Sequence, residues 1–311
     1  MGKVKALLVI FVFLFGALLI NTEPASAIEQ QYDYKMAEKI NKAIADLENK
    51  SGNVKRQAKK ELIDWGEASV EPLLEVVKNW REKDPDLRVE CVNILGEIKD
   101  KRAVPVIISV LNEKHMTMRY SAARSLGKIG DNRATPDLIK LLEDPESEVR
   151  FYTAEAIGNI GDEQASKPLA NVVLNDSTAK VRLAAITALD KVGGKSESKA
   201  VIDALADSDP DVRGYAAELA ASWAIQEGLP IITRMIKEDR ANIARAACAR
   251  ALGVYNDITA VPSLIVALDD GYSEVKLCAL NSLKKISGQN YGNDKAAWNH
   301  WFELNKDKAK V

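Results

Sequence analysis

The side chains that could bind a metal are few and widely separated. The 311 residues include only two histidines, His115 and His300, and they cannot form a pair at i, i+3 or i+4. Neither has cysteines or carboxylates nearby at the spacing of a ligand set. The sequence therefore predicts no metal ligands.

The three cysteines are the only thiol nucleophile candidates. Catalysis by Cys or Ser needs an adjacent base that a third group orients. Cys91 and Cys248 occur where a repeat described below otherwise has Ala or Thr, so we interpret them as small core residues, and Cys278 lies one residue off that face. A Cys248–Cys278 disulfide is the less favoured alternative, because neighbouring helices pack 8–10 Å apart.

Glycine pairs such as Gly127/Gly130 and Gly158/Gly161 could suggest a phosphate-binding loop, but they lie at helix ends of the same repeat. No catalytic or cofactor-binding residue and no cofactor is predicted. The 43 basic and 45 acidic residues give a net charge of -2. This balance makes nucleic acid and anionic lipid poor candidates as partners.

The first 27 residues have the pattern of a secretory signal peptide. Lys3 and Lys5 precede an apolar run at 6–20, and Ala25-Ser26-Ala27 follows. We expect cleavage after Ala27, with an uncleaved anchor as the alternative and no membrane insertion after cleavage. The mature chain is then expected to be exported, either to a periplasm or to the extracellular medium.

The remaining chain repeats one unit about eight times. Basic residues recur at intervals of 31 to 33 residues, and every one of them begins the same local pattern. The eight are Lys55, Arg88, Arg119, Arg150, Arg182, Arg213, Arg245 and Lys276. Relative to each, the positions -1, +3, +7 and +10 are apolar or small, which is one face of an amphipathic helix.

Turn residues follow that helix at fixed offsets. At +11 stand Gly66, Gly130, Gly161, Gly193 and Asn256, which tolerate a left-handed C-cap. Aspartate is common at +12 and proline at +17, and these residues predict a second helix. The repeat at Arg213 has Ala224 and Ile225 in place of Gly and Asp, so its first helix is expected to continue to Gly228.

Two helices in about 31 residues predict an all-α solenoid with N- and C-terminal capping helices. Stretches such as VRFYTAEAIGNIGD at 149–162 resemble HEAT repeats, in particular the short bacterial repeats of phycobilisome lyase-like proteins. The family also includes deoxyhypusine hydroxylase, whose irons are held by His-Glu pairs. His115 precedes Met116 and His300 precedes Trp301, so the resemblance implies the fold without the iron site.

The expected organisation has four parts: a signal peptide at 1–27, a capping helix at 28–53, the array at 54–288 and a Trp-rich capping helix at 289–311. Met36, Ile40, Ile44 and Leu47 form the apolar face of the first cap. Trp298, Trp301 and Phe302 form that of the last, and either Asn293 or Asp294 is expected to cap its helix. An aromatic ligand platform is the alternative interpretation of these rings.

The recurring charges predict a ladder along the stack. Ladder and capping roles are expected for Arg119, Arg150, Arg182 and Arg213 together with Asp131 and Asp162, each charge lying near its neighbours in adjacent repeats. An anion-binding strip is the alternative.

Two surfaces could bind a partner. The second helices are expected to line a concave face through their +21 positions, of which Lys140, Asn171, Asp203 and Arg234 are the candidate partner-binding residues, flanked by Ser109 and Val266. On the first helices, Tyr120, Phe151, Tyr152 and Tyr215 could form a partner patch, although packing between repeats is the favoured interpretation.

We therefore predict a non-catalytic scaffold that binds a protein or peptide. The alternatives are an enzyme or enzyme subunit related to phycobilisome lyases or deoxyhypusine hydroxylase, and a structural subunit of a cell-envelope complex. The pattern does not specify an oligomeric state.

Overall fold

The computed structural model describes residues 25–79 and 83–307, and the secondary structure of these residues is helical throughout. They belong to two compact units, Met1–Leu62 and Ile63–Val311. Within the described residues, no helix combines the length and the apolar character needed to span a membrane. The all-α prediction is confirmed.

The first unit contains α2 (Ala25–Asp46) and most of α3 (Gly52–Asp64). Ile40, Ile44 and Leu47 of the predicted apolar face are buried on or directly after α2, and Met36 is half-buried. The predicted signal peptide lies outside the described residues, except that α2 begins at Ala25 and includes its last three residues.

The second unit consists of paired antiparallel helices joined by short turns. The first helices are α5 (Pro85–Ile98), α7 (Met116–Ile129), α9 (Ser147–Ile160), α11 (Ala179–Lys191), α13 (Pro210–Ser222), α15 (Asn242–Tyr255) and α17 (Ser273–Ser287). The second helices are α4 (Glu67–Lys78), α6 (Val104–Ser109), α8 (Thr135–Leu141), α10 (Ser166–Asn175), α12 (Ser198–Ala204), α14 (Gly228–Glu238) and α16 (Val261–Ala267), and α18 (Lys295–Asn305) ends the described chain.

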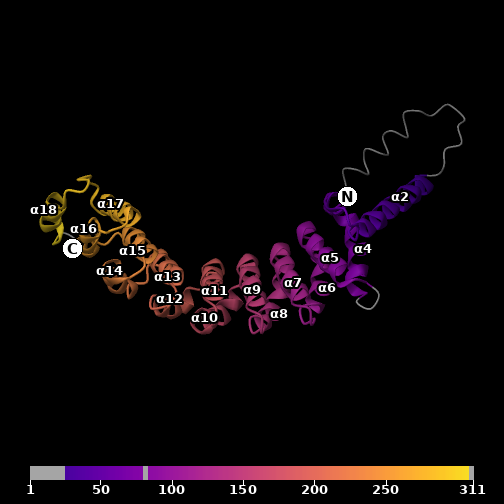
Figure 1. Cartoon of the computed structure of the whole chain (residues 1–311), viewed down its shortest axis with the longest axis horizontal. Helices are drawn as coiled ribbons and strands as arrows, with labels where there is room; N and C mark the ends of the chain where they lie inside the picture. The colour runs from indigo at the N-terminus through magenta and orange to yellow at the C-terminus, as the bar shows by residue number, and fades with distance from the viewer. Residues whose placement is uncertain (1–24, 80–82, 308–311) are drawn as a thin grey trace, which may run out of the picture. The chain divides into compact units, whose positions relative to one another are not determined.

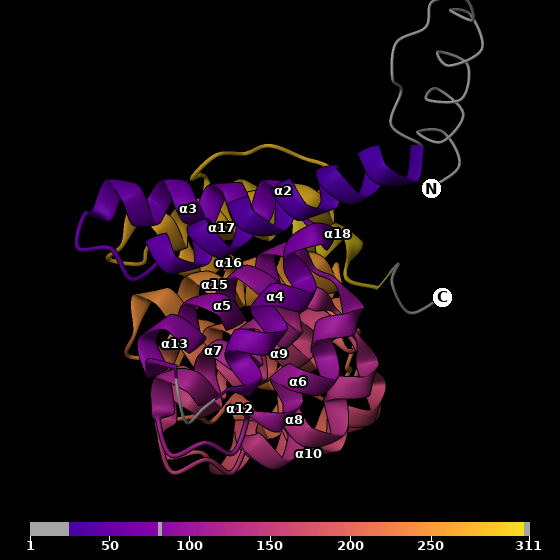
Figure 2. The same ribbon diagram turned by 90° about the vertical axis from the view of Figure 1, so that its right-hand side faces the viewer.

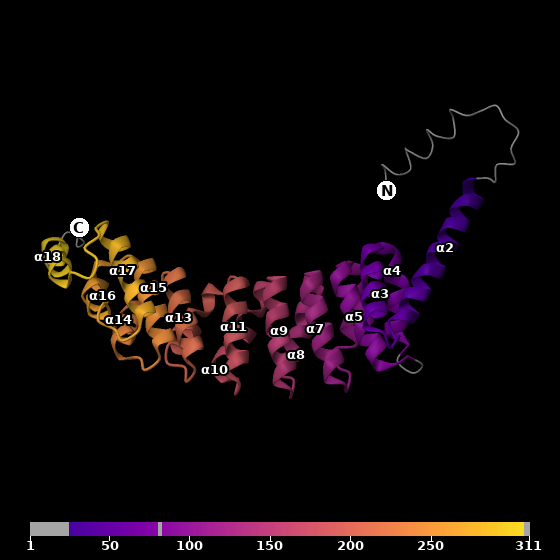
Figure 3. The same cartoon turned by 45° about the horizontal axis from the view of Figure 1, so that its top comes forward.

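The first helices lie side by side in chain order, and the second helices form a parallel row behind them (Figures 1 and 3). In the view of Figure 2, α6, α8 and α10 lie below α5, α7 and α9. The core lies between the two rows. In this unit every -1, +3 and +7 residue is buried, whereas the +10 residues near the helix ends are mostly half-buried. The predicted apolar face is therefore confirmed.

The turns after the first helices have the predicted left-handed backbone. Gly130, Gly161 and Asn256 have φ of 70°, 75° and 56°. Asp100, Asp131, Asp162 and Asp257 then accept hydrogen bonds from the backbone N–H two residues later, and each caps a short 3₁₀ turn before the second helix.

The predicted extension of the helix after Arg213 is wrong. Helix α13 ends at Ser222, and Ala224 adopts the left-handed conformation with φ of 58°. Neighbouring repeats hold this turn, since Trp223 Nε1 donates to Asp190 at 3.1 Å and Tyr255 Oη donates to the Ile225 carbonyl at 2.6 Å. Tertiary contacts thus impose the turn on an alanine that does not favour it.

The C-terminal aromatic residues pack as a cap. Trp298 is fully buried, and its Nε1 donates to the Gly292 carbonyl at 2.9 Å. The ring of Tyr291 contacts it edge-on at 4.8 Å, and α18 packs against α16. Asp294, rather than Asn293, caps α18 through the Ala297 N–H. Trp301 and Phe302 remain half-buried.

Candidate protein-binding surface

A ladder of ion pairs runs along one edge of the second unit. Each repeat arginine reaches an acid 25 or 26 residues later, in the loop before the next repeat. The pairs are Arg88–Glu113, Arg119–Asp144, Arg150–Asp176, Arg182–Asp207, Arg213–Asp239 and Arg245–Asp270, with N···O distances of 2.6 to 2.7 Å. In the last five pairs both Nε and an Nη atom bind the carboxylate, which is the geometry of a strong bidentate contact.

The first five acids of the ladder also accept a hydrogen bond, through their backbone carbonyls, from the arginine of the following repeat. Asp176 accepts from Arg150 through its carboxylate, and its backbone carbonyl accepts from Arg182 at 2.9 Å. Asp207 links Arg182 to Arg213 in the same way. The predicted ladder therefore exists with the predicted arginines. Asp131 and Asp162 are not part of the ladder, which corrects that part of the prediction. Their carboxylates cap the 3₁₀ turns instead, and the predicted capping role is confirmed.

The ladder does not provide the alternative anion-binding strip. In Arg119, Nε and one Nη bind Asp144, while the other Nη donates to the carbonyls of Glu113 and Lys114. The Arg119 side chain is only 11% exposed. Its donors are used inside the protein, so we interpret the ladder as structural.

Acid is expected to weaken the fold through these carboxylates. Hydrogen bonds from the Arg133 side chain, and then from its backbone N–H, lower the pKa of Asp131 from 3.8 to about 2. Burial alone would raise the pKa of Asp207, but hydrogen bonds from Arg182 and from the Asp209 N–H outweigh it and lower the pKa. A lowered pKa in the folded state gives stability that is present above the unfolded value and is lost as pH falls through the folded value.

We therefore expect the unfolding midpoint in urea to fall as pH decreases from about 4 to about 2. Asp131→Asn is expected to make that fall smaller, because one of the titrating groups is removed. Glu155→Gln, which changes an exposed acid without an ion pair in the described part of the chain, is the control. An unchanged pH dependence in Asp131→Asn would contradict the assignment.

The predicted second-helix row is exposed, and its members bond mainly within their own helices. Lys140 pairs with Asp137, Asp203 with Lys199, and Arg234 with Glu238. Asn171 accepts a hydrogen bond from Asn175. Ser109 and Val266 are also exposed.

Asp203 additionally lines a polar cavity of about 330 Å³ beside the Arg182–Asp207 pair. These residues are therefore exposed on the second helices, but most of them are polar and already have an ion-pair or hydrogen-bond partner in their own helix.

The aromatic residues of the first helices pack between repeats, as favoured by the sequence. The rings of Tyr120 and Tyr152 lie 5.3 Å apart, and Phe151 contacts Tyr152 at 5.1 Å. Tyr215 Oη donates to Asp190 at 3.4 Å. All four rings are half-buried, so each still has an exposed edge.

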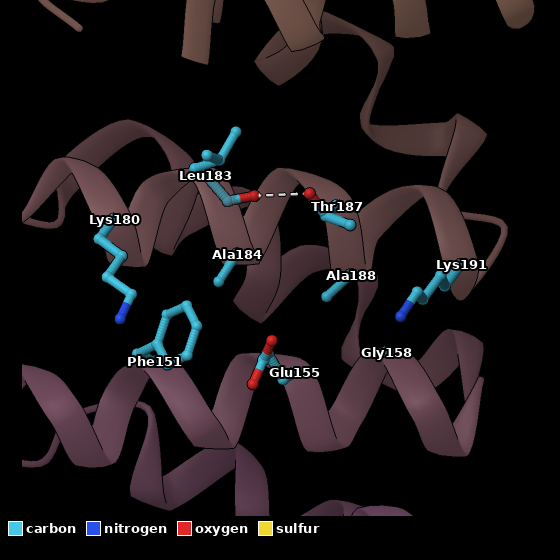
Figure 4. Close-up of a pocket in the computed structure, with 9 residues that line it drawn as sticks. All are labelled: Phe151, Glu155, Gly158, Lys180, Leu183, Ala184, Thr187, Ala188 and Lys191. Atoms are coloured by element: carbon cyan, nitrogen blue, oxygen red, sulfur yellow. Dashed lines mark hydrogen bonds between the residues drawn. The ribbon is translucent and has the colours of Figure 1, made fainter. Parts of the chain in front are cut away.

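A cavity of about 260 Å³ opens between α9 and α11, and sequence reasoning missed it (Figure 4). Its floor consists of Gly158, Ala184 and Ala188, because α9 and α11 approach closely there. A Cβ on Gly158 would lie 2.9 Å from the Ala188 Cα. Phe151 and Leu183 form apolar walls.

A second cavity of about 230 Å³ is lined by α11, α13 and α15. Leu183 lines both cavities, and Tyr215 and Ile243 supply further apolar surface. Ile243 is 48% exposed. We call these two neighbouring cavities together the first-helix groove. A repeat in the sequence marks the buried positions, whereas this groove depends on small side chains in adjacent helices.

The described residues also bear on the metal and thiol predictions. They contain no group of three or more His, Cys, Asp or Glu side chains placed to hold a metal. The three cysteines are thiols, as the sequence favoured. Burial raises the pKa of the Cys248 thiol to about 12.

Known proteins match both the repeat and the fold. HEAT repeats are matched at residues 70–150, 135–206 and 198–284, which together span more than two thirds of the chain. No curated protein matches the sequence.

Solved structures with a similar fold include the following three. The structure of YibA from E. coli is 20% identical, covers 85% of this chain and 99% of its own, and has a TM-score of 0.58. Kap121p bound to Ste12p is 11% identical and has a TM-score of 0.61, with 83% of this chain and 34% of that chain covered. The CpcE and CpcF complex of phycocyanin lyase from Nostoc is 21% identical, covers 74% of this chain and 92% of its own, and has a TM-score of 0.43.

Proposed function

The chain belongs to the HEAT-repeat family, and from this premise we propose that it is a non-catalytic scaffold that binds a protein or peptide in the first-helix groove. The observation that carries the proposal is the pair of cavities that share Leu183, which leaves Phe151, Leu183 and Ile243 accessible along four successive first helices. Apolar side chains of a partner would lose contact with water there, which favours binding.

The second-helix row supports binding less well. Lys140, Asp203 and Arg234 pair with neighbours in their own helices, and the polar cavity beside Asp203 is lined by Asp176, Asp207 and Arg182, which are already paired. A partner would have to desolvate these charges without offering better ones. Among solenoids of this fold, Kap121p is found bound to Ste12p.

The proposal is tested by placing a photo-crosslinking phenylalanine analogue at Leu183 or at Asn171 in the cells that make the protein. We expect a discrete adduct from Leu183, none from Asn171, and loss of the adduct when Ile243→Asp is added. An adduct only from Asn171 would assign binding to the second-helix row. Adducts from neither site would contradict the scaffold, and an adduct of twice the chain mass would identify a second copy as the occupant.

We also propose that the chain is exported after removal of residues 1–27, on the basis of the basic start, apolar run and Ala25-Ser26-Ala27. The measurement is the mass and N-terminal sequence of the protein recovered outside the cytoplasm. We expect Ile28 as the first residue, and recovery of only the full-length chain inside the cell would refute the proposal.

A further inference from the structure

The groove between α9 and α11 has an ordered pattern of charges (Figure 4). Lys180 and Lys191 lie at its two ends, and Glu155 lies between them on the opposite helix. Glu155 is exposed and forms no ion pair in the described part of the chain. Lys180 lies over the Phe151 ring at 4.1 Å, and Lys191 donates to Asn159 at 3.1 Å. These weak, exposed contacts leave both ammonium groups able to pair with a partner.

The floor of this groove offers few hydrogen-bond partners to the backbone of an extended peptide. Gly158, Ala184 and Ala188 present no polar side-chain atom, and Thr187 Oγ1 already donates to the Leu183 carbonyl at 2.8 Å. An extended partner would leave backbone N–H and C=O groups without hydrogen bonds where it covers this floor. A helix satisfies its own backbone groups, and two packed helices offer a groove into which the side chains of a third can fit.

The lysine spacing matches a helical partner. Lys180 and Lys191 are separated by 11 residues of α11, a rise of about 16 Å at 1.5 Å per residue. Eleven residues are close to three full turns, so two acids with the same spacing would lie on one face of a partner helix. A basic residue between them would lie near Glu155.

We propose that the groove between α9 and α11 binds an amphipathic α-helix with acidic residues toward both ends of its binding face and a basic residue between them. This inference rests on the proposed function and specifies the class of partner. Charges in the order acid, base, acid complement the order Lys180, Glu155, Lys191 of the groove.

The test uses the whole chain and three synthetic 18-residue peptides with a fluorescent label. The first has Glu at positions 4 and 15, Lys at 8 and 11, and leucines flanking them on the same face. Two lysines present a base to Glu155 whichever way the helix runs. The second peptide exchanges all Glu and Lys, and the third keeps the first sequence but has a central proline that disrupts the helix.

Fluorescence anisotropy at about 0.15 M salt is the measurement, because surface ion pairs remain partly unscreened there. The first peptide is expected to bind at least about tenfold more tightly than the other two. The variant Lys180→Glu/Lys191→Glu should bind the second peptide more tightly than the first. The control Lys167→Glu/Lys199→Glu makes the same change of charge on α10 and α12 and should keep the original order.

Several outcomes would overturn the inference. Equal binding of the first and second peptides would refute the charge pattern, and equal binding of the proline peptide would assign an extended partner. The same reversal in the control variant would indicate a general charge effect. Thermal melting of both variants checks that they fold. If Leu183 still crosslinks to a partner while the peptides fail, the groove remains the binding surface and only the class of partner is wrong.

Discussion

Replacing Arg182 with alanine is expected to lower the free energy of unfolding by about 3 to 5 kcal/mol, because it leaves a buried carboxylate without its partner. The side chains of Arg182 and Asp207 are 10% and 8% exposed and are joined by two hydrogen bonds. Arg182 also donates to the Asp176 carbonyl at 2.9 Å, so the change removes a link to the preceding repeat. Urea denaturation measures the total loss, and hydrogen exchange should show it concentrated in α11 to α13.

Arg124→Ala is the matched control, since Arg124 is exposed on α7 and outside the ladder. It should change the free energy by less than about 0.5 kcal/mol. The double variant Arg182→Ala/Asp207→Ala should lose clearly less than the sum of the two single variants, because each single change leaves the other charge unpaired. Strictly additive losses would show that the ladder is not a coupled structural element.

Replacing Gly127 with alanine is expected to lower the free energy of unfolding by about 2 to 3 kcal/mol, as overpacking does in a tight core. A Cβ at this position would lie 2.6 Å from the Ala156 Cα, which is backbone and cannot turn aside. Alanine is intrinsically the better helix former by about 1 kcal/mol. Helix propensity alone would therefore raise the free energy of unfolding, so a decrease can be assigned to the close approach of α7 and α9.

Gly271→Ala serves as its control, because nothing lies within 4 Å of a Cβ there. It should change the free energy of unfolding by less than about 1 kcal/mol, and any change should be an increase. Thermal and urea unfolding of the two variants, measured side by side, decide the comparison. A Gly127→Ala protein as stable as the parent would mean that the two helices can separate without loss.

The same close approach explains the first-helix groove. Gly127 against Ala156 and Gly158 against Ala188 bring neighbouring first helices close together, and the floor of the cavity between α9 and α11 lies at the second of these contacts. The junction of α11 and α13 departs from this pattern, since Asp190 stands where four other repeats have glycine. Its carboxylate accepts from Trp223 and Tyr215 of the next repeat. The groove at Leu183 lies on this junction.

Sequence reasoning was strong where an interaction is local. The offsets -1, +3 and +7 identified buried residues because helical periodicity alone brings them to one face. Gly130 and Gly161 were assigned to left-handed turns because that conformation depends on a single residue. It was wrong at Ala224, where Trp223 and Tyr255 hold a turn that the local residues do not favour.

The period, the two-helix unit, the buried face and the arginines of the ladder are therefore predictable from the amino-acid sequence. The acids that complete the ladder are not, because they are selected by contacts between repeats. Asp131 and Asp144 are both close candidates along the chain, but the backbone N–H of Arg133 is within reach of Asp131 in its own turn, and folding brings Asp144 against Arg119. The groove is tertiary for the same physical reason: periodicity specifies which face of a helix is buried, whereas the space between two helices depends on the side chains that both contribute.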